Sequence, residues 1–448
     1  MNLRAVVISN LAMLVASAAA PAGASRAGGD SWELHAAVLV DAGPAPVIAA
    51  ADGSVVSTPA ANRPQTAVFE VAYTGFPAAA RQAFDAAADV WSRYIVSSVP
   101  IRIDARWQPL DDQRLGEHTQ RSATWDPEVD SKLPVRDVLY PYSLAQAIGG
   151  KRTNANADAR ITLNANKPWY TGTDGRPGPD QLDLMTVALH EIGGSLGMSS
   201  AVNITASGRA FIDAEFPTIY DTLLTTSNGT SLLSLMKASP AAAAAEITGG
   251  WVYVRSNTVQ ATVAPAGVRV YGPRPFDDGS SLIHLSPADY AWPGDDSLMT
   301  PGTYRGTASH DPGPIALAIL HDLGWGISGL GHPARVATSV LPSPAIAGQP
   351  LGAALVLRVL DPVGALVSDD NETVITAGYR HTGTAEIGCE TSPAQRVTAG
   401  VATYSGCEAD GSGFLYISGQ SPDLVTGSSN ITFVAATRRI VPSISSAP

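Results

Sequence analysis

The sequence predicts a mixed α and β domain over residues 25–330, followed by a small all-β domain over residues 331–448. Three observations predict this order. Strand patterns and helices with an apolar stripe alternate in the first part. A linker containing Pro and Gly separates the two parts. Residues 350–435 then consist of short alternating segments divided by turns, which is typical of a β-sandwich.

The first 24 residues predict export. Arg4 precedes a mostly apolar run from Ala5 to Ala20, and the small residues Ala22-Gly23-Ala24 follow. These three parts in this order form a secretory signal peptide, so we expect a mature chain that starts near Ser25 and is secreted, extracellular or periplasmic. A membrane anchor is the weaker alternative, because the run is short and interrupted by polar residues.

Charge and composition exclude some partners. The 448 residues carry a formal net charge of −12, only 15% are charged, and there is no basic run. Such a chain is poorly suited to bind nucleic acid or an anionic membrane. No later segment is long and apolar enough to span a bilayer. Nothing in the sequence indicates an oligomeric state.

The elements of the first domain follow in a regular order. Residues 76–95 predict an amphipathic helix that buries Phe84 and Trp91. Strands are predicted at Trp32 to Val40, Val68 to Tyr73, Pro100 to Trp107 and Ala159 to Leu163, with loop between the first two. Residues 201–283 form a long insertion. In it we expect helix at L-L-S-L-M-K and at the alanine run 241–245, and strands from Gly249 to Arg269.

Residues 180–200 predict the helix around which the domain is organised. Its apolar stripe consists of Leu182, Met185, Leu189, Ile192 and Leu196. Asp180 is the expected N-cap, and Gly197 suits the helix exit. His190 and Glu191 lie just off the stripe, where a helix can present polar side chains to a cleft.

The string H-E-I-G-G at residues 190–194 resembles the H-E-x-x-H motif of the zincin metallopeptidases. In that family two histidines one helical turn apart bind Zn²⁺, the metal lowers the pKa of a bound water, and the glutamate accepts its proton. The resemblance implies a zincin-like fold, a twisted mixed sheet with an active-site helix. It also implies His190 as a zinc ligand, Glu191 as general base, zinc as cofactor, and a peptide or protein substrate.

The sequence departs from the motif at its second histidine, where Gly194 stands. The third ligand of the extended motif would fall at Ser200, which is not a histidine either. The best candidate for the third ligand is His284, in the segment G-S-S-L-I-H-L; the alternative is an ordinary polar residue at a strand end. Because catalytic zinc usually has three protein ligands, Gly194 is the main obstacle to activity.

Other side chains are weaker candidates for the same site. His310 and His321 follow later in the chain, and His321 is expected to be a satisfied histidine in or near the end of an apolar helix. Asp213 or Asp221 of the insertion could also replace the missing ligand. The sequence alone does not choose among them.

Three later segments carry further resemblances. S-L-M-T-P, residues 297–301, resembles the Met-turn of the metzincins, in which Met299 would lie beneath the metal. Pro312 to Trp325 predicts a buried helix with Gly324 as its C-terminal cap, comparable to the L-x-D-L-G-W with which secreted bacterial zincin-like proteins often close the catalytic domain. Residues 350–435 resemble bacterial Ig-like domains, which implies a spacer or adhesion module.

The two cysteines, Cys389 and Cys407, both lie in this C-terminal part. In an exported protein two nearby cysteines are expected to form one disulfide. A thiol nucleophile in the first domain is excluded, because no cysteine precedes residue 389.

Three hypotheses of function remain. The chain is an exported zinc metallopeptidase that acts through Glu191, or a catalytically inactive pseudopeptidase that serves as an extracellular binding or adhesion module. The third is that Gly194 inactivates this copy of an otherwise active lineage. Zinc content and peptidase activity separate the first hypothesis from the other two.

Overall fold

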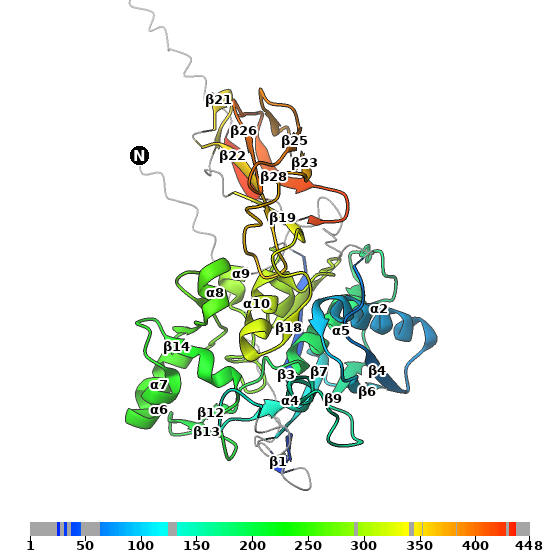
Figure 1. Cartoon of the computed structure of the whole chain (residues 1–448), viewed down its shortest axis with the longest axis vertical. Helices are drawn as coiled ribbons and strands as arrows, with labels where there is room; N and C mark the ends of the chain where they lie inside the picture. The colour runs from blue at the N-terminus through cyan, green and yellow to red at the C-terminus, as the bar shows by residue number, and fades with distance from the viewer. Residues whose placement is uncertain are drawn as a thin grey trace, which may run out of the picture.

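The computed structural model describes residues 25–26, 31–33, 37–45, 63–123, 132–290, 294–339, 345–351, 353–381, 383–426 and 430–435. The predicted signal peptide lies outside these residues. The architecture is mixed α and β: helices and a large sheet form the lower body in Figure 1, and an all-β part lies above it. Among the described residues, no helix is long and apolar enough to cross a membrane.

The large sheet has a mixed strand order. Its order is β17-β3-β7-β9-β6-β4, formed by β17 (Gly302–Arg305), β3 (Ala37–Pro44), β7 (Arg114–Ala123), β9 (Ala159–Asn164), β6 (Ile101–Gln108) and β4 (Phe69–Thr74). Strands β4, β6 and β9 are parallel, whereas β7 runs antiparallel to both β9 and β3. Short strands β1 (Ser25–Arg26), β2 (Ser31–Glu33) and β8 (Tyr140–Pro141) extend the sheet beside β7. The predicted strands at β4, β6 and β9 are confirmed.

Two strand assignments differ from the sequence prediction. β7 was not predicted, because its inward positions include the polar residues His118 and Gln120, so the alternation of apolar residues is missing. β3 continues to Pro44, where a loop was predicted from Asp41 on. Its pairing with β7 on one side and β17 on the other extends the strand beyond its apolar residues.

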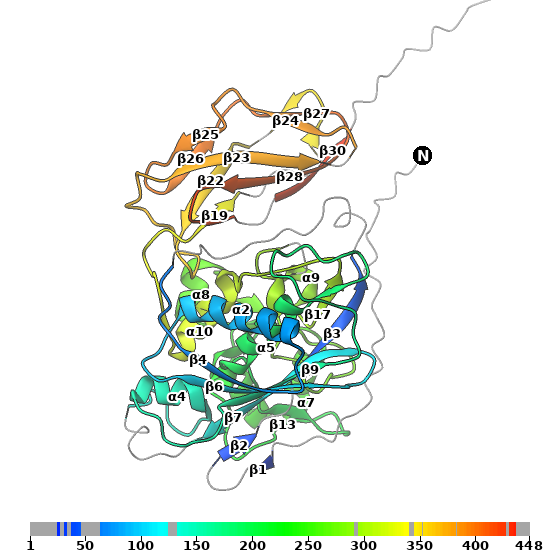
Figure 2. The same ribbon diagram turned by 90° about the vertical axis from the view of Figure 1, so that its right-hand side faces the viewer.

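Two helices pack side by side on one face of this sheet, as Figure 2 shows. Helix α2 (Ala78–Tyr94) is the predicted amphipathic helix, and α5 (Leu184–Ser195) carries the H-E-I-G-G string. They approach closely, since the Trp91 indole N–H donates to the Leu189 carbonyl over 2.9 Å. The body also contains α4 (Tyr142–Gly149) and α10 (Gly313–Leu323), and Gly324 ends α10 in the left-handed conformation, as predicted.

The start of α5 corrects the predicted N-cap. Asp183, not Asp180, caps the helix: its Oδ2 accepts from the Thr186 N–H over 2.8 Å. The chain is still extended at β11 (Leu182–Asp183), which pairs with β10 (Trp169–Tyr170). The helix therefore begins three residues later than a cap at Asp180 would require.

The insertion of residues 201–283 has its own small elements. They are β12 (Val202–Ile204), β13 (Ala210–Ile212), η1 (Tyr220–Leu223), β14 (Leu224–Thr226), α6 (Leu232–Ala238), α7 (Pro240–Thr248), β15 (Val252–Val254), α8 (Asn257–Thr262) and β16 (Val268–Arg269). The two expected helices, α6 and α7, are confirmed. Between β15 and β16, however, α8 stands where strand was predicted. Its N-terminal N–H groups bind the Asp322 carboxylate in α10, which stabilises the helix.

Beyond α9 (Pro287–Tyr290), η2 (Ser297–Met299), α10 and β18 (Gly326–Ile327), the chain enters the all-β part. One sheet has the order β26-β22-β19-β29, another β20-β30-β28-β23-β25, and a third β21-β27-β24. The bounds are β19 (Arg335–Thr338), β20 (Ala345–Ile346), β21 (Gln349–Pro350), β22 (Leu355–Leu360), β23 (Val374–His381), β24 (Glu386–Gly388), β25 (Ala394–Arg396), β26 (Val401–Tyr404), β27 (Glu408–Asp410), β28 (Gly413–Gln420), β29 (Val425–Thr426) and β30 (Asn430–Ala435). This part has its own apolar cluster, and the Cys389–Cys407 disulfide is present.

Candidate metal-binding site

His190 and His284 lie together although 94 residues separate them in the chain. His190 comes from α5, and His284 from the segment that precedes α9. Their Nε2 atoms are 3.2 Å apart, and both side chains are buried. The structure thus brings together the first predicted ligand and the best candidate for another.

The other ring nitrogen of each histidine fixes the position of its proton. His190 Nδ1 donates to the Leu298 carbonyl over 2.6 Å, and His284 Nδ1 donates to the Ser280 carbonyl over 2.9 Å. A carbonyl oxygen only accepts, so both Nδ1 atoms carry hydrogen, and in the neutral rings both Nε2 atoms present lone pairs. Burial lowers the pKa of His190 and of His284, which favours these neutral forms.

Two lone pairs that face each other at this distance repel unless a positive centre, either a shared proton or a metal ion, lies between them. Two nitrogens each about 2.0–2.1 Å from a tetrahedral zinc ion stand about 3.3 Å apart, close to the distance between the two Nε2 atoms. Histidine ligands commonly donate their other N–H to a backbone carbonyl, as His190 and His284 both do. The pair therefore fits a zinc ion as two of its ligands.

The segment that resembles a Met-turn packs against α5. Met299 belongs to η2 and is buried, and a Cβ placed on Gly193 would lie 3.3 Å from its sulfur. The preceding residue, Leu298, supplies the carbonyl that orients His190. The turn therefore positions the helix histidine.

The Glu191 side chain forms a hydrogen bond with a side chain of strand β7. Its Oε2 lies 2.7 Å from Nδ1 of His118, and both side chains are buried. A Cβ on Gly116 would lie 2.7 Å from Glu191 Oε1, so the absence of a side chain there makes room for the carboxyl group. The predicted general base thus forms a hydrogen bond to a histidine that no sequence motif indicated.

Burial favours the neutral forms of both partners. It raises the pKa of Glu191 to about 8 and lowers the pKa of His118 to about 4. A nearby cation would reverse this preference for Glu191, because a positive charge stabilises the carboxylate. The carboxylate would then accept the Nδ1 proton of His118.

His118 also occupies space beside Gly194. A Cβ placed on Gly194 would lie 2.7 Å from His118 Nε2 and closer still to its Cε1. This histidine was not predicted from the sequence, because it lies in a strand without apolar alternation and outside any motif. The available signal was a polar run, E-H-T-Q-R, that contains a histidine.

The other candidate residues lie in separate hydrogen-bond networks. His310 Nε2 is 2.7 Å from Asp183 Oδ2, so it anchors the start of α5. Asp221 accepts from Ser200 Oγ over 2.6 Å and from two backbone N–H groups, which holds the loop after α5. His321 is partly exposed and bonds to Thr258 at the junction of α8 and α10.

Asp213 does not complete the site either. It accepts a long hydrogen bond of 3.5 Å from Asn203, the residue in β12 that pairs with β13. Within the described ranges, no group of three His, Cys, Asp or Glu side chains lies close enough to hold a metal ion. The geometry therefore brings together two candidate zinc ligands, His190 and His284, without a third beside them among the described residues.

Strand β3 lies beside the site. Leu39 is buried and, with His190 and Thr300, lines a cavity of about 10 Å³. A water molecule needs roughly this much space. This cavity beside His190 therefore has room for about one water molecule.

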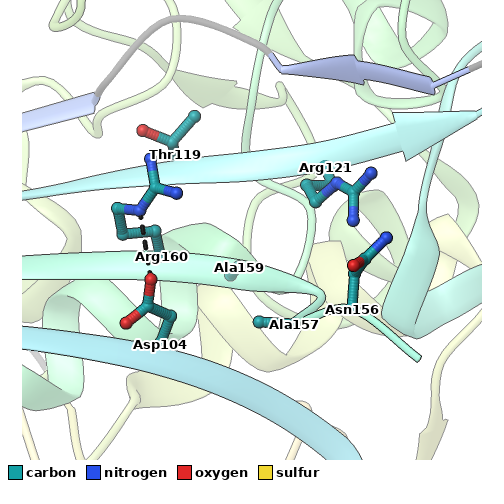
Figure 3. Close-up of a pocket in the computed structure, with 7 residues that line it drawn as sticks. All are labelled: Asp104, Thr119, Arg121, Asn156, Ala157, Ala159 and Arg160. Carbon is teal, nitrogen blue, oxygen red and sulfur yellow. Dashed lines mark hydrogen bonds and ion pairs between the residues drawn. The ribbon is translucent and has the colours of Figure 1, made fainter. Parts of the chain in front are cut away.

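A second, polar hollow of about 370 Å³ lies over β6, β7 and β9 (Figure 3). Thr119, Arg121 and Arg160 line it, and Arg160 pairs with Asp104. In β7 these positions alternate with His118, so this hollow lies on the face of the sheet opposite α5. It is separate from the histidine pair.

Comparison with known proteins gives no further constraint. No protein-family model matches the chain. No curated protein matches it either.

Proposed function

We propose that the chain is an exported zinc-dependent hydrolase of the metallopeptidase type, which cleaves peptide bonds in a peptide or protein substrate. His190 and His284 are zinc ligands, and Glu191 is the general base. The observation that carries the proposal is the 3.2 Å approach of the two Nε2 atoms, with both Nδ1 protons donated to backbone carbonyls. Such a pair is arranged to share one cation.

Zinc, when bound, would act as a Lewis acid that lowers the pKa of a water molecule in its open coordination position. Glu191 follows His190 directly on α5. Burial alone raises its pKa to about 8, and a cation bound beside it would favour the carboxylate that a general base requires. To accept a proton from that water, the carboxyl group would use Oε1, which has no hydrogen-bond partner among the described residues, while Oε2 stays hydrogen-bonded to His118. Strand β3 lies beside His190, so we expect this strand to move when a peptide enters.

The same proposal assigns finer classes to the two parts of the fold. The body is zincin-like, supported by the mixed sheet, the helix α5 and the turn that carries Met299. The C-terminal part is an Ig-like sandwich with a spacer or adhesion role, supported by its two larger sheets and the disulfide. Residues 1–24 direct export and are then removed.

A second candidate function is a pseudopeptidase that binds an extracellular partner without cleaving it. Specific observations favour this alternative: Gly194 replaces a ligand, and Glu191 is fully buried and bonded to His118. A base held in this way does not face a substrate. The two candidates predict the same fold and differ in catalysis.

Zinc content of the purified mature protein tests the proposal. We expect about one zinc ion per chain, lost in the variants His190→Ala and His284→Ala and retained in His321→Ala, whose side chain is partly exposed. If zinc is present, hydrolysis of a mixed peptide library that is abolished in Glu191→Gln supports the metallopeptidase. Zinc without hydrolysis supports the pseudopeptidase, and absence of zinc overturns both ligand assignments.

A further inference from the structure

His118 and position 194 compete for the same space. Position 194 lies one helical turn after His190, so its side chain would lie on the same face of α5. A Cβ on Gly194 would approach His118 Nε2 to 2.7 Å, which is closer than unbonded atoms allow. The His118 ring in β7 therefore occupies the space that the side chain of a histidine at position 194 would enter.

The three histidines have the same hydrogen-bond pattern. In each, Nδ1 is bonded to an oxygen: Leu298 O for His190, Ser280 O for His284, and Glu191 Oε2 for His118. Metal-binding histidines commonly have their second nitrogen bonded to a carbonyl or a carboxylate in this way. The pattern leaves the Nε2 atom of each ring for another partner.

The hydrogen-bonding capacity of the His118 side chain is only partly satisfied among the described residues. Among the described residues, its Nε2 atom is buried and has no hydrogen-bond partner, and Glu191 Oε1 is in the same condition. Buried polar atoms without a partner are costly, so they point to a ligand or ion that completes the site.

We propose that His118 supplies the third zinc nitrogen, in place of the histidine that Gly194 lacks. This inference rests on the proposed zinc site of His190 and His284. Since no three such side chains among the described residues surround one point, the His118 ring has to turn towards the pair when zinc binds. Glu191 then positions His118 through its Nδ1 atom. This ligand thus comes from strand β7, whereas in the zincin motif the histidine that it replaces comes from the helix that corresponds to α5.

The test compares zinc affinity, measured by competition with a chelator, in the mature protein and its variants. We expect His118→Gln to weaken zinc binding by at least about tenfold, because even outer-shell partners contribute about 10–100-fold. In the swap His118→Ala with Gly194→His, the imidazole returns to the helix, and affinity recovers to within about tenfold of the native protein. The Co²⁺-loaded swap should keep the tetrahedral absorption of the native protein, whereas His118→Gln should lose it.

His310→Gln is the matched control. Its partner Asp183 lies at 2.7 Å and both side chains are buried, as in the pair of His118 and Glu191. A loss of affinity caused only by damage to a buried histidine–carboxylate pair would appear in His310→Gln as well, and that result overturns the inference. The swap guards against misfolding, because its recovery requires a folded site.

The outcomes separate this inference from the proposed function. If His118→Gln binds zinc as tightly as the native protein while His190→Gln does not, His118 is no ligand and the proposed zinc site stands. If the native protein binds no zinc, or binds it equally well after His190→Gln and His284→Gln, the proposed function and this inference fail together.

Discussion

Arg335 and Asp311 form a buried ion pair between the all-β part and the body. Arg335 Nη2 donates to Asp311 Oδ1 over 2.6 Å, and the Tyr94 hydroxyl donates to Oδ2 of the same carboxylate over 2.6 Å. Arg335 begins β19, while Tyr94 ends α2. The pair therefore couples the two parts of the chain, although each has its own apolar cluster.

Replacing this arginine should strongly destabilise the protein. We expect Arg335→Met to lower the free energy of unfolding by about 3–5 kcal/mol, because it leaves the Asp311 carboxylate buried without its cation. The control is Arg396→Ala, which breaks an ion pair with Glu372 whose side chains are 59% and 89% exposed. That change should cost at most about 1 kcal/mol in urea unfolding. Equal effects of the two variants would contradict this prediction.

Gly193 should be needed for the contact of α2 with α5. A Cβ at this position would lie 2.6 Å from Cζ2 of Trp91, so Gly193→Ala should cost about 1–3 kcal/mol through overpacking. This exceeds the gain of about 1 kcal/mol that alanine brings to a helix. The weakness that two successive glycines cause in the helix is therefore offset by close packing.

A double-mutant cycle checks the cause. Trp91→Phe removes the part of the ring that meets the new methyl group, so Gly193→Ala should cost less in that background. Urea unfolding of the four proteins gives the coupling energy. A coupling energy of zero would show that the glycine is required for another reason.

Asp296 should make the protein less stable as the pH rises. Burial, with the neighbouring carboxylate of Asp295, raises the pKa of Asp296 from 3.8 to about 7. Between about pH 4 and 7 the folded protein therefore binds a proton that the unfolded chain has released, and the stability that this proton gives is lost towards pH 7.

The variant Asp296→Asn isolates this contribution. Its side-chain oxygen can still accept from the Ile315 N–H, which Asp296 Oδ1 binds over 2.8 Å. We expect thermal unfolding of the variant to depend less steeply on pH over this range. The exposed Glu372→Gln is the control. A pH dependence unchanged in Asp296→Asn would show that its carboxyl titrates normally.

Helices with a strong apolar periodicity were predictable from the sequence. The apolar periods of α2 and α10 predicted both helices, and Gly324 predicted the end of α10, because these signals depend on neighbouring residues alone. The predicted N-cap of α5, Asp180, was wrong because a second aspartate, Asp183, lies three residues later. The choice of Asp183 depends on a strand pairing and on His310, 127 residues away.

The site could be predicted only in part. His190 and Glu191 came from a local motif, but the approach of His284 depends on the path of an insertion that has no spacing rule. His118 could not be predicted, since β7 buries polar residues on the face where a strand usually buries apolar ones. The position of His118 depends on its hydrogen bond to Glu191 in α5 and not on a local sequence pattern.

Leu39 should control access to the histidine pair. It is buried and lines the small cavity beside His190, so Leu39→Ala should enlarge that cavity. The change should cost about 2–5 kcal/mol of stability, the usual range for a buried leucine. It should also speed the chemical acylation of His190 and His284 by diethylpyrocarbonate in metal-free protein, as followed by mass spectrometry.

Val38→Ala is the matched control for Leu39→Ala, because it lies one residue away and on the opposite face of β3. It should leave the acylation rate of the two histidines close to native, although it shortens a side chain on the same strand. If both variants accelerate acylation equally, loosening of the whole strand is the cause. If neither does, reagents reach the histidines by a route that β3 does not cover, and a peptide could enter without moving that strand.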